Sequence, residues 1–249
     1  MRIAVAGATG RAGRHVVEIL EGRGHDVVPI ARSTGVDVIT GDGLADALAG
    51  AEVIVDLSTG PSPDEAAATE FFTTAARNLQ EHAREAGVQR IVVVSIVGID
   101  RFTGGYNAAK LAQERAYEDG PIPVRILRAA QFHEFVGQLV DWGRDGDVAR
   151  VPEMRTQLVA ARTVAEALAD LATDPGAVPG PTLEIAGPRE ESMVDAARRL
   201  TAKRGDAVRI EGVTWDPLYE QGAALPGPDA TLAGPTFAEW LVASAPVRS

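Results

Sequence analysis

Apolar residues recur along the chain in two alternating patterns, short continuous runs and longer stretches with helical spacing. Short runs rich in β-branched residues are typical of buried strands, whereas apolar positions three and four apart indicate amphipathic helices. The runs predict strands at residues 2–6, 26–31, 36–39, 52–57, 91–94, 124–127 and 182–185. The helical spacing predicts helices at residues 14–20, 44–48, 64–86, 106–117, 132–142, 163–172, 192–203 and 236–242.

The alternation of strands and helices is typical of a parallel sheet with crossover helices. Residues 91–94 are β-branched throughout, as expected for a central strand buried on both faces. Beyond Gln131 the alternation weakens, and the last fifty residues are rich in Pro and Gly before the final helix. The pattern predicts an α/β fold with a doubly wound parallel sheet, the Rossmann arrangement.

A glycine-rich turn, Gly7-Ala8-Thr9-Gly10-Arg11-Ala12-Gly13, directly follows the first predicted strand and opens the first predicted helix. Such a turn brings bare backbone N–H groups and a helix N-terminus up to a pyrophosphate. We therefore predict a dinucleotide site formed by Gly7, Thr9, Gly10, Arg11 and Gly13. Residues 1–130 would be the dinucleotide-binding core, and residues 131–249 would complete the same compact unit and form the substrate pocket.

The end of the second predicted strand bears on which dinucleotide binds. Sites that prefer NAD place Asp or Glu there to hold the ribose 2′-hydroxyl, whereas this chain has Ala31-Arg32-Ser33. Arg32 suits a 2′-phosphate, with Arg11 or Arg14 as a second cation, so we predict NADP(H) as the cofactor. The alternative interpretation of Arg32 is a solvated surface side chain. Topology alone adds further candidate contacts: Ser33 beside Arg32, Asp42 and Leu44 flanking the adenine, and Ser58 and Thr59 between pyrophosphate and ribose.

Tyr106 and Lys110 are four residues apart in a predicted helix and so share one face. A neighbouring ammonium favours the phenolate and is expected to lower the pKa of Tyr106, and Lys110 would also bind the nicotinamide ribose. Tyr106 would give its proton to a carbonyl oxygen during reduction. Ser95, at the end of the fifth predicted strand, would hydrogen-bond that oxygen as charge develops.

These motifs resemble those of the short-chain dehydrogenase/reductase superfamily, matching Gly-x-x-Gly-x-x-Gly, Ser-x-x-Gly and Tyr-x-x-x-Lys in order over roughly the first 130 residues. The chain is most similar to the atypical, NmrA-like NAD(P)H-binding branch, on the Gly-Ala-Thr-Gly start and on residues 127–132 and 185–188. The resemblance implies activities from ketone, quinone or enone reduction to redox sensing. Ser95 and Tyr106 are eleven residues apart, closer than is typical of the superfamily. This short spacing leaves open an alternative in which Ser95 misses the substrate and touches the nicotinamide carboxamide.

Composition narrows the possible partners. The chain of 249 residues carries a net charge of -11, without the basic stretch typical of nucleic-acid binding, and without an apolar stretch long enough to span a membrane. The simplest expectation is a cytoplasmic protein, a monomer or homodimer. It has no cysteine, and its four histidines lack metal-ligand spacing, so we expect no metal site.

The leading hypothesis is therefore an NADPH-dependent reductase of a small or medium apolar carbonyl. Gln131, Phe132 and His133 lie where a substrate pocket would begin, and His133 is either a second proton donor or a hydrogen-bonded wall residue. Two other hypotheses stay open. One is a non-catalytic NADP(H) sensor; the other is an isomerase, epimerase or cyclase that uses the same site.

Overall fold

The structure, a computed structural model, describes residues 1–174 and 181–244. The chain divides into two units: Met1–Arg128 with Val164–Leu183, and Ala129–Thr163 with Glu184–Ser249. The segment 164–183 thus belongs with the first unit, whereas the sequence pattern assigned everything after residue 130 to the C-terminal part of a single unit. No helix within the described ranges is both long and apolar enough to cross a membrane.

A seven-stranded sheet organises the fold, in the order β12-β9-β5-β4-β3-β1-β2. Its strands are β1 (Arg2–Ala6), β2 (Asp26–Ile30), β3 (Val53–Asp56), β4 (Arg90–Ile96), β5 (Val124–Ala129), β9 (Thr182–Ala186) and β12 (Thr231–Leu232). β1 pairs in parallel with β2 and β3, and β3 pairs in parallel with β4. The predicted doubly wound α/β fold is therefore confirmed.

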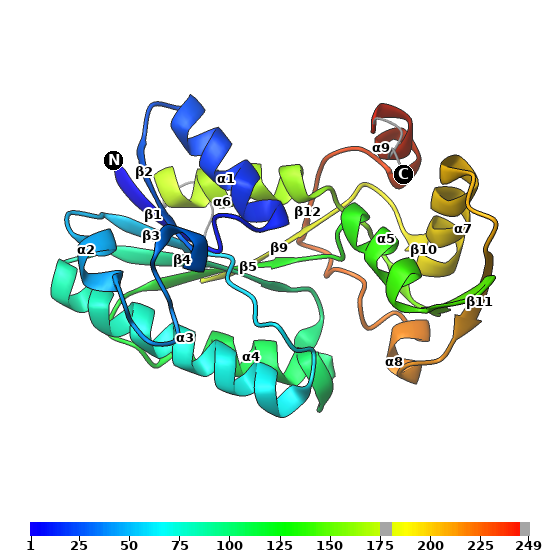
Figure 1. The fold of residues 1–249 in the computed structure, drawn as a ribbon, viewed down its shortest axis with the longest axis horizontal. Helices are drawn as coiled ribbons and strands as arrows, with labels where there is room; N and C mark the ends of the chain where they lie inside the picture. Colours follow the sequence, from blue (N-terminus) through cyan, green and yellow to red (C-terminus); the bar gives the residue numbers. More distant parts are fainter. Residues whose placement is uncertain (175–180, 245–249) are drawn as a thin grey trace. The chain divides into compact units, whose positions relative to one another are not determined.

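Helices cover both faces of this sheet in the first unit. They are α1 (Arg11–Gly22), α2 (Leu44–Leu48), α3 (Glu65–Ala86), α4 (Gly105–Glu118) and α6 (Ala161–Thr173). In Figure 1, α1 and α6 lie on one face, and α3 and α4 lie on the other. Core residues from β1, β3 and β4 pack against Ala75 and Leu79 of α3 and Tyr117 of α4.

The predicted strand at residues 36–39 does not form; residues 38 and 39 are in a turn, and residues 36 and 37 have no regular secondary structure. The Asp37 side chain accepts a hydrogen bond from the Ile39 N–H at 2.7 Å, and the Asn78 amide donates to the carbonyls of Val38 and Ile39. The backbone groups that a strand would pair are thus partly satisfied locally and by α3. Side chain to backbone bonds of this kind compete with sheet pairing.

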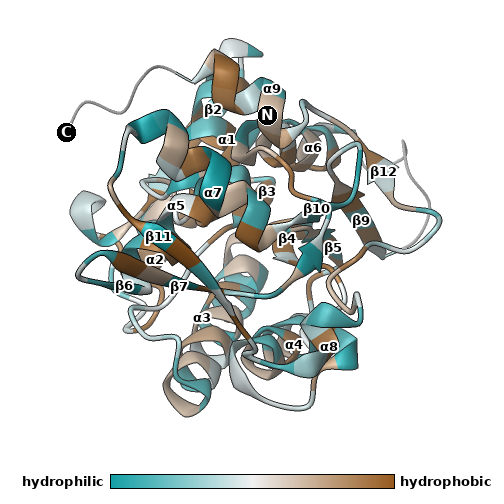
Figure 2. Cartoon of the chain, turned by 90° about the vertical axis from the view of Figure 1, so that its right-hand side faces the viewer, coloured by the Kyte–Doolittle hydropathy of each residue, from teal (hydrophilic) through white to brown (hydrophobic). Residues whose placement is uncertain are grey.

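The second unit contains a three-stranded sheet that the hydrophobic pattern did not predict, in the order β11-β7-β6. Its strands are β6 (Arg144–Asp145), β7 (Val148–Pro152) and β11 (Arg209–Val213), and β8 (Arg155–Thr156) pairs separately with β10 (Glu191–Ser192). The helices α5 (His133–Trp142), α7 (Met193–Arg204), α8 (Pro217–Glu220) and α9 (Phe237–Ala243) complete it. α7 carries both hydrophobic and hydrophilic residues (Figure 2), and its Met193, Ala197 and Leu200 are in the core of this unit.

Candidate active site

The glycine-rich turn is built by close backbone contacts. Gly7 has φ 75°, and a Cβ on it would lie 2.6 Å from the Leu57 carbonyl oxygen. A Cβ on Gly13 would lie 2.1 Å from the Gly7 carbonyl oxygen. Gly10 is the N-cap of α1, and its N–H donates to the Gly7 carbonyl at 2.9 Å. The close path of the chain thus favours glycine at these three positions, because side chains there would meet neighbouring backbone atoms.

The N-terminus of α1 is suited to an anion. Its N-cap makes no side-chain hydrogen bond, and its first turn has no acidic residue. Thr9, Arg11 and Arg14 are exposed at this helix end. Free N–H groups, the helix dipole and basic side chains together favour a phosphate group.

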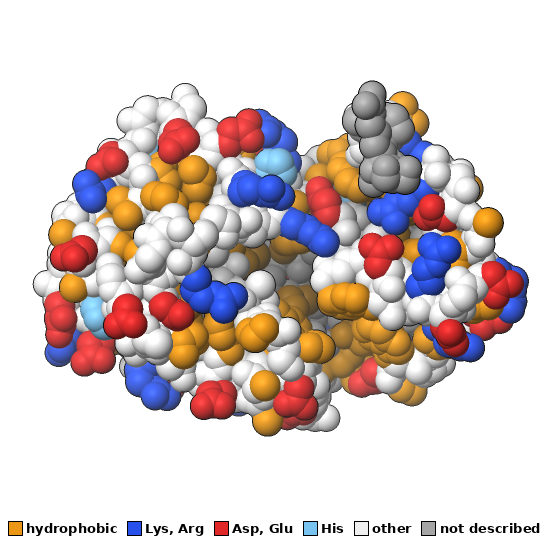
Figure 3. Space-filling view, viewed as in Figure 1, with side chains coloured by type: hydrophobic (Ala, Val, Ile, Leu, Met, Phe, Trp, Pro, Cys, Tyr) orange, Lys and Arg blue, Asp and Glu red, His pale blue; other side chains and the backbone are white. Residues whose placement is uncertain are grey.

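Arg32 and Ser33 are exposed in a 3-10 turn, η1 (Arg32–Thr34), that directly follows β2. The turn is held by Thr34, whose hydroxyl donates to the Ala31 carbonyl at 2.8 Å. Acidic and basic side chains are interspersed on the face drawn in Figure 3. Arg32 is accessible to a ligand, as a contact to a 2′-phosphate requires.

The two residues expected beside the adenine differ in exposure. Asp42 is exposed, and its carboxylate accepts a hydrogen bond from the Thr40 hydroxyl at 2.8 Å. Leu44 is fully buried in the core of the first unit, and its N–H donates to the Gly41 carbonyl. The structure therefore corrects the prediction for Leu44, because its side chain packs inside this unit.

Tyr106 lies in the first turn of α4 with its ring packed edge-on against Phe72, at 5.6 Å between ring centroids. Its hydroxyl is 3.1 Å from the hydroxyl oxygen of Thr59, which follows β3. Burial raises the pKa of Tyr106, and the hydrogen bond to Thr59 opposes that shift only in part. The expectation that Lys110 lowers this pKa is therefore wrong, and the phenol stays protonated at neutral pH, as a proton donor must.

Lys110 is buried, and its ammonium points to β4 and to its own helix. Nζ donates to the Val94 carbonyl at 2.8 Å and to the Gln113 side-chain oxygen, and it lies 4.7 Å from the centre of the Phe72 ring. Burial lowers the pKa of Lys110 to about 8, although the charges of Asp56 and Glu114 raise it. The hydrogen bonds of the Lys110 ammonium go to acceptors other than the phenol, which explains why Lys110 does not lower the pKa of Tyr106.

Two buried serine hydroxyls lack a partner among the residues that the structure describes, Ser58 and Ser95. β3 and β4 pair in register at Asp56 and Val93, and each serine lies two residues beyond its strand's paired residue. Both hydroxyls thus follow the paired segments toward the carboxyl ends of neighbouring strands. Buried polar groups without partners are costly, so these positions fit a ligand that supplies them.

These features fit a dinucleotide. The glycine turn packs closely against the N-terminus of α1, a helix end that suits a pyrophosphate, and the orphan hydroxyls lie at the strand ends where such folds bind the rest of the molecule. Thr59, Tyr106 and Lys110 come together within the same unit. The predicted residues of the first unit, with Leu44 excepted, are thus compatible with this group.

Sequence reasoning missed a buried polar network behind Lys110. Asp56, the last residue of β3, is fully buried and accepts hydrogen bonds from Gln113 Nε2 at 3.0 Å and from the Tyr117 hydroxyl at 2.7 Å. The available signal was an Asp that ends an otherwise apolar strand, because a buried carboxylate needs partners. Gln113 shares a helix face with Lys110, three residues away.

A buried ion pair lies next to this network. Glu114 of α4 receives two hydrogen bonds from the Arg128 guanidinium, at 3.0 and 2.7 Å. Asp100 of the 3-10 turn η2 (Ile99–Arg101) lies 3.2 Å from the same guanidinium. The pair therefore ties the loop before α4, the helix itself and the end of β5 together, which restrains the segment that carries Tyr106.

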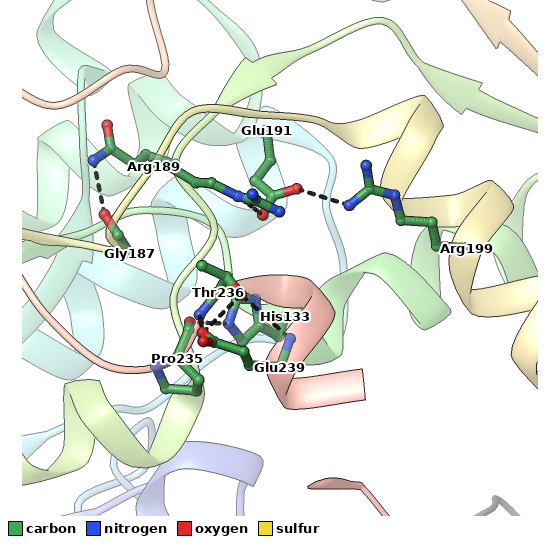
Figure 4. Close-up of polar contacts among 9 residues, drawn as sticks. His133, Gly187, Arg189, Glu191, Arg199, Pro235, Thr236 and Glu239 are labelled. Carbon is green, nitrogen blue, oxygen red and sulfur yellow. Dashed lines mark hydrogen bonds and ion pairs between the residues drawn. The ribbon is translucent and has the colours of Figure 1, made fainter. Parts of the chain in front are cut away.

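The three candidate substrate residues belong to the second unit. Gln131 accepts a hydrogen bond from the Thr156 hydroxyl, and half-buried Phe132 is the N-cap of α5. His133 is fully buried, and its Nε2 donates to the Pro235 carbonyl at 3.1 Å (Figure 4). Its ring contacts those of Phe237 and Trp240. Burial lowers the pKa of His133, so the ring is neutral at pH 7. Of the two interpretations of His133, the structure favours the hydrogen-bonded residue over the proton donor, and it places the ring inside the second unit.

Comparison with known proteins identifies the family of the chain. A family described as NAD(P)H-binding matches residues 7–175. L-arabinose 1-dehydrogenase (NAD(P)(+)) of Haloferax volcanii is 37% identical over 103 residues, 38% of this chain and 40% of that protein. The chain thus spans less than half of this relative.

Solved structures share the fold at low identity. MoeE5 in complex with UDP-glucose and NAD is 19% identical with a TM-score of 0.75, covering 97% of this chain and 96% of that one. A dTDP-4-dehydrorhamnose reductase from Bacillus anthracis in complex with NADP is 16% identical with a TM-score of 0.72, covering 96% of each chain. UDP-N-acetylglucosamine 4-epimerase from Bacillus cereus is 18% identical with a TM-score of 0.69, covering 97% and 94%. With a family match that spans most of its length and a glycine turn shaped for a dinucleotide, the chain belongs to the NAD(P)H-binding family, which confirms the expected resemblance at that level.

Proposed function

We propose that this protein is an NADPH-dependent oxidoreductase that reduces a small or medium apolar carbonyl compound. The observation that carries the proposal is the pair on α4, a protonated phenol at its first turn and a buried ammonium four residues later. The phenol is oriented by Thr59, and the ammonium is fixed to the carbonyl that precedes Ser95. The ammonium is retained in the interior, where its charge is costly.

Each residue has a distinct role in the proposed reaction. Bound reduced nicotinamide supplies the hydride. Tyr106 donates a proton to the carbonyl oxygen, a step for which its raised pKa keeps it in the required form. Ser95 hydrogen-bonds the same oxygen, which gives its unpartnered hydroxyl an acceptor. Lys110 stabilises negative charge that develops on the phenol and holds the ribose.

The experiment is an assay of NADPH oxidation over a panel of ketones, quinones and aldehydes. The partial likeness to an L-arabinose dehydrogenase motivates a second arm, with L-arabinose and other aldoses and either oxidised cofactor. Turnover on a carbonyl supports the proposal. Cofactor binding without turnover on any compound would favour a redox sensor, and product formation without net NADPH oxidation would favour an isomerase or epimerase.

Arg32 is expected to select NADPH over NADH. An Arg32→Ala variant should lose about tenfold to a hundredfold in affinity for NADPH and little for NADH, because it loses a charge-assisted hydrogen bond to the 2′-phosphate. Calorimetric titration of both cofactors measures the ratio. Arg77, another exposed arginine, lies on α3, so Arg77→Ala is the matched control. An unchanged NADPH/NADH affinity ratio in Arg32→Ala would contradict this assignment.

A further inference from the structure

A continuous chain of hydrogen bonds runs from the end of β3 to the ammonium of Lys110. The Asp56 carboxylate accepts from the Ser58 N–H at 2.8 Å through one oxygen, and from Gln113 and Tyr117 through the other. Gln113 in turn accepts from Lys110. Asp56 and Lys110 are thus joined by a single side-chain amide.

The amide of Gln113 has only one productive orientation. An ammonium is a donor only and an ionised carboxylate is an acceptor only, so the amide oxygen must face Lys110 and the NH₂ must face Asp56. Burial and the charge of Asp56 raise the pKa of Tyr117, so its hydroxyl stays protonated and also donates to Asp56. Each hydrogen bond described for Asp56 thus comes from a donor, and the carboxylate at one end of the Gln113 amide and the ammonium at the other favour the same orientation.

We propose that Asp56 is a positioning residue for the reaction: it locks the Gln113 side chain so that an oxygen, and not an NH₂ group, meets the Lys110 ammonium. The consequence for catalysis rests on the proposed function. The effect of Asp56 on the Lys110 ammonium does not depend on that function.

Other groups near Lys110 do not replace this one. From α4 itself, Glu114 faces it but is engaged by Arg128, and Asp100 of η2 binds the same guanidinium. From α3 the neighbour is the neutral ring of Phe72, and from β4 it is the Val94 carbonyl. Asp56 is the carboxylate that the Gln113 amide links to Lys110 Nζ through hydrogen bonds.

Lys110 can be observed directly, because the sequence contains only two lysines, Lys110 and Lys203. With lysine labelled at ¹³Cε, an NMR titration of the whole protein follows both, and exposed Lys203 is an internal reference. Asp56→Asn removes the negative charge and leaves an amide that can present either its oxygen or its NH₂, so the Gln113 oxygen is held less firmly against the ammonium. The Lys110 midpoint should then fall by about one pH unit or more from its value near 8.

A compensating pair of changes tests the orientation itself. In Asp56→Asn with Gln113→Glu, the amide introduced on β3 would donate to the carboxylate introduced on α4, which would accept from Lys110, so donors and acceptors match again and the charge is conserved. The Lys110 midpoint should return to at least the wild-type value. Tyr117→Phe is the matched control, because it removes a hydrogen bond to the same Asp56 oxygen and leaves the link to Gln113; the midpoint should stay within about 0.3 unit. If Asp56→Asn does not fold, Gln113→Met breaks the same link and should lower the midpoint.

A Lys110 midpoint unmoved by breaking the link, unrestored by the double change, or lowered equally by Tyr117→Phe would overturn the proposal. In catalysis, the high-pH limb of kcat should follow the same order of variants, because Lys110 loses its charge as pH rises through its pKa. The expected changes in the Lys110 midpoint without turnover would contradict the proposed function and support the role of Asp56. Turnover without those changes would support the proposed function and contradict the role of Asp56.

Discussion

Replacing Tyr106 with phenylalanine is expected to lower kcat for carbonyl reduction about 10²-fold to 10⁴-fold, the usual effect of removing a positioned proton donor. The ring would still pack edge-on against Phe72, so the fold and the cofactor site should be kept. Stopped-flow or steady-state NADPH oxidation measures kcat. Fluorescence titration with NADPH should give a Kd within about twofold of wild type, since no cofactor contact is removed.

Thr59→Val separates loss of the proton from loss of its orientation. This variant keeps the phenol but removes the hydroxyl that lies 3.1 Å from it. We expect a smaller fall in kcat, about tenfold, in line with the loss of one hydrogen bond. Equal kcat in wild type and Tyr106→Phe would remove Tyr106 as the acid, whatever the Thr59 variant does.

Most of the fold of the first unit could be predicted from the sequence, because its helices and strands are determined by local patterns. Strand 2–6 and helix 44–48 were predicted with the bounds that the structure has. The helix predicted at 64–86 begins one residue later, since Asp64 is its N-cap and accepts from the Ala67 N–H. Apolar periodicity and caps act over a few residues, so the chain itself carries this information.

The second unit was less readable because short pairings depend on distant partners. β6, β8 and β10 have two residues each, too few for a periodic pattern. β7 and β11 pair in parallel although Arg209 lies 61 positions after its partner Val148 in the sequence. Packing between segments so far apart, not local propensity, creates these strands.

At the candidate site, the residue types could be predicted from the sequence, but the directions of their pKa shifts could not. The sequence places Tyr106 and Lys110 on one helix face, but the direction of each pKa follows from burial, which no spacing encodes. The same holds for Asp56, whose partners come from α4, and for His133, which is enclosed by α9. Motifs thus identified the candidate reacting groups, and the surrounding packing decides the protonation state of each.

Replacing Gly13 with alanine should abolish or greatly weaken cofactor binding. The added Cβ would lie 2.1 Å from the Gly7 carbonyl oxygen and 2.9 Å from its carbon, so the turn must move away from the helix. Because both atoms are backbone, no side chain can yield instead. A strain of about 1–3 kcal/mol is typical of overpacking. If it falls on the binding-competent turn, NADPH affinity drops about tenfold to a hundredfold.

Gly22→Ala is the matched control, since Gly22 is the last residue of the same helix and a Cβ there meets nothing within 4 Å. It should bind NADPH as wild type does and unfold at a slightly higher temperature, because alanine favours a helix by up to about 1 kcal/mol over glycine. Calorimetric titration and thermal unfolding of both variants measure the contrast. Gly13→Ala with wild-type affinity would mean that close packing of turn and helix is not what shapes the site, and the pyrophosphate would have to be placed elsewhere.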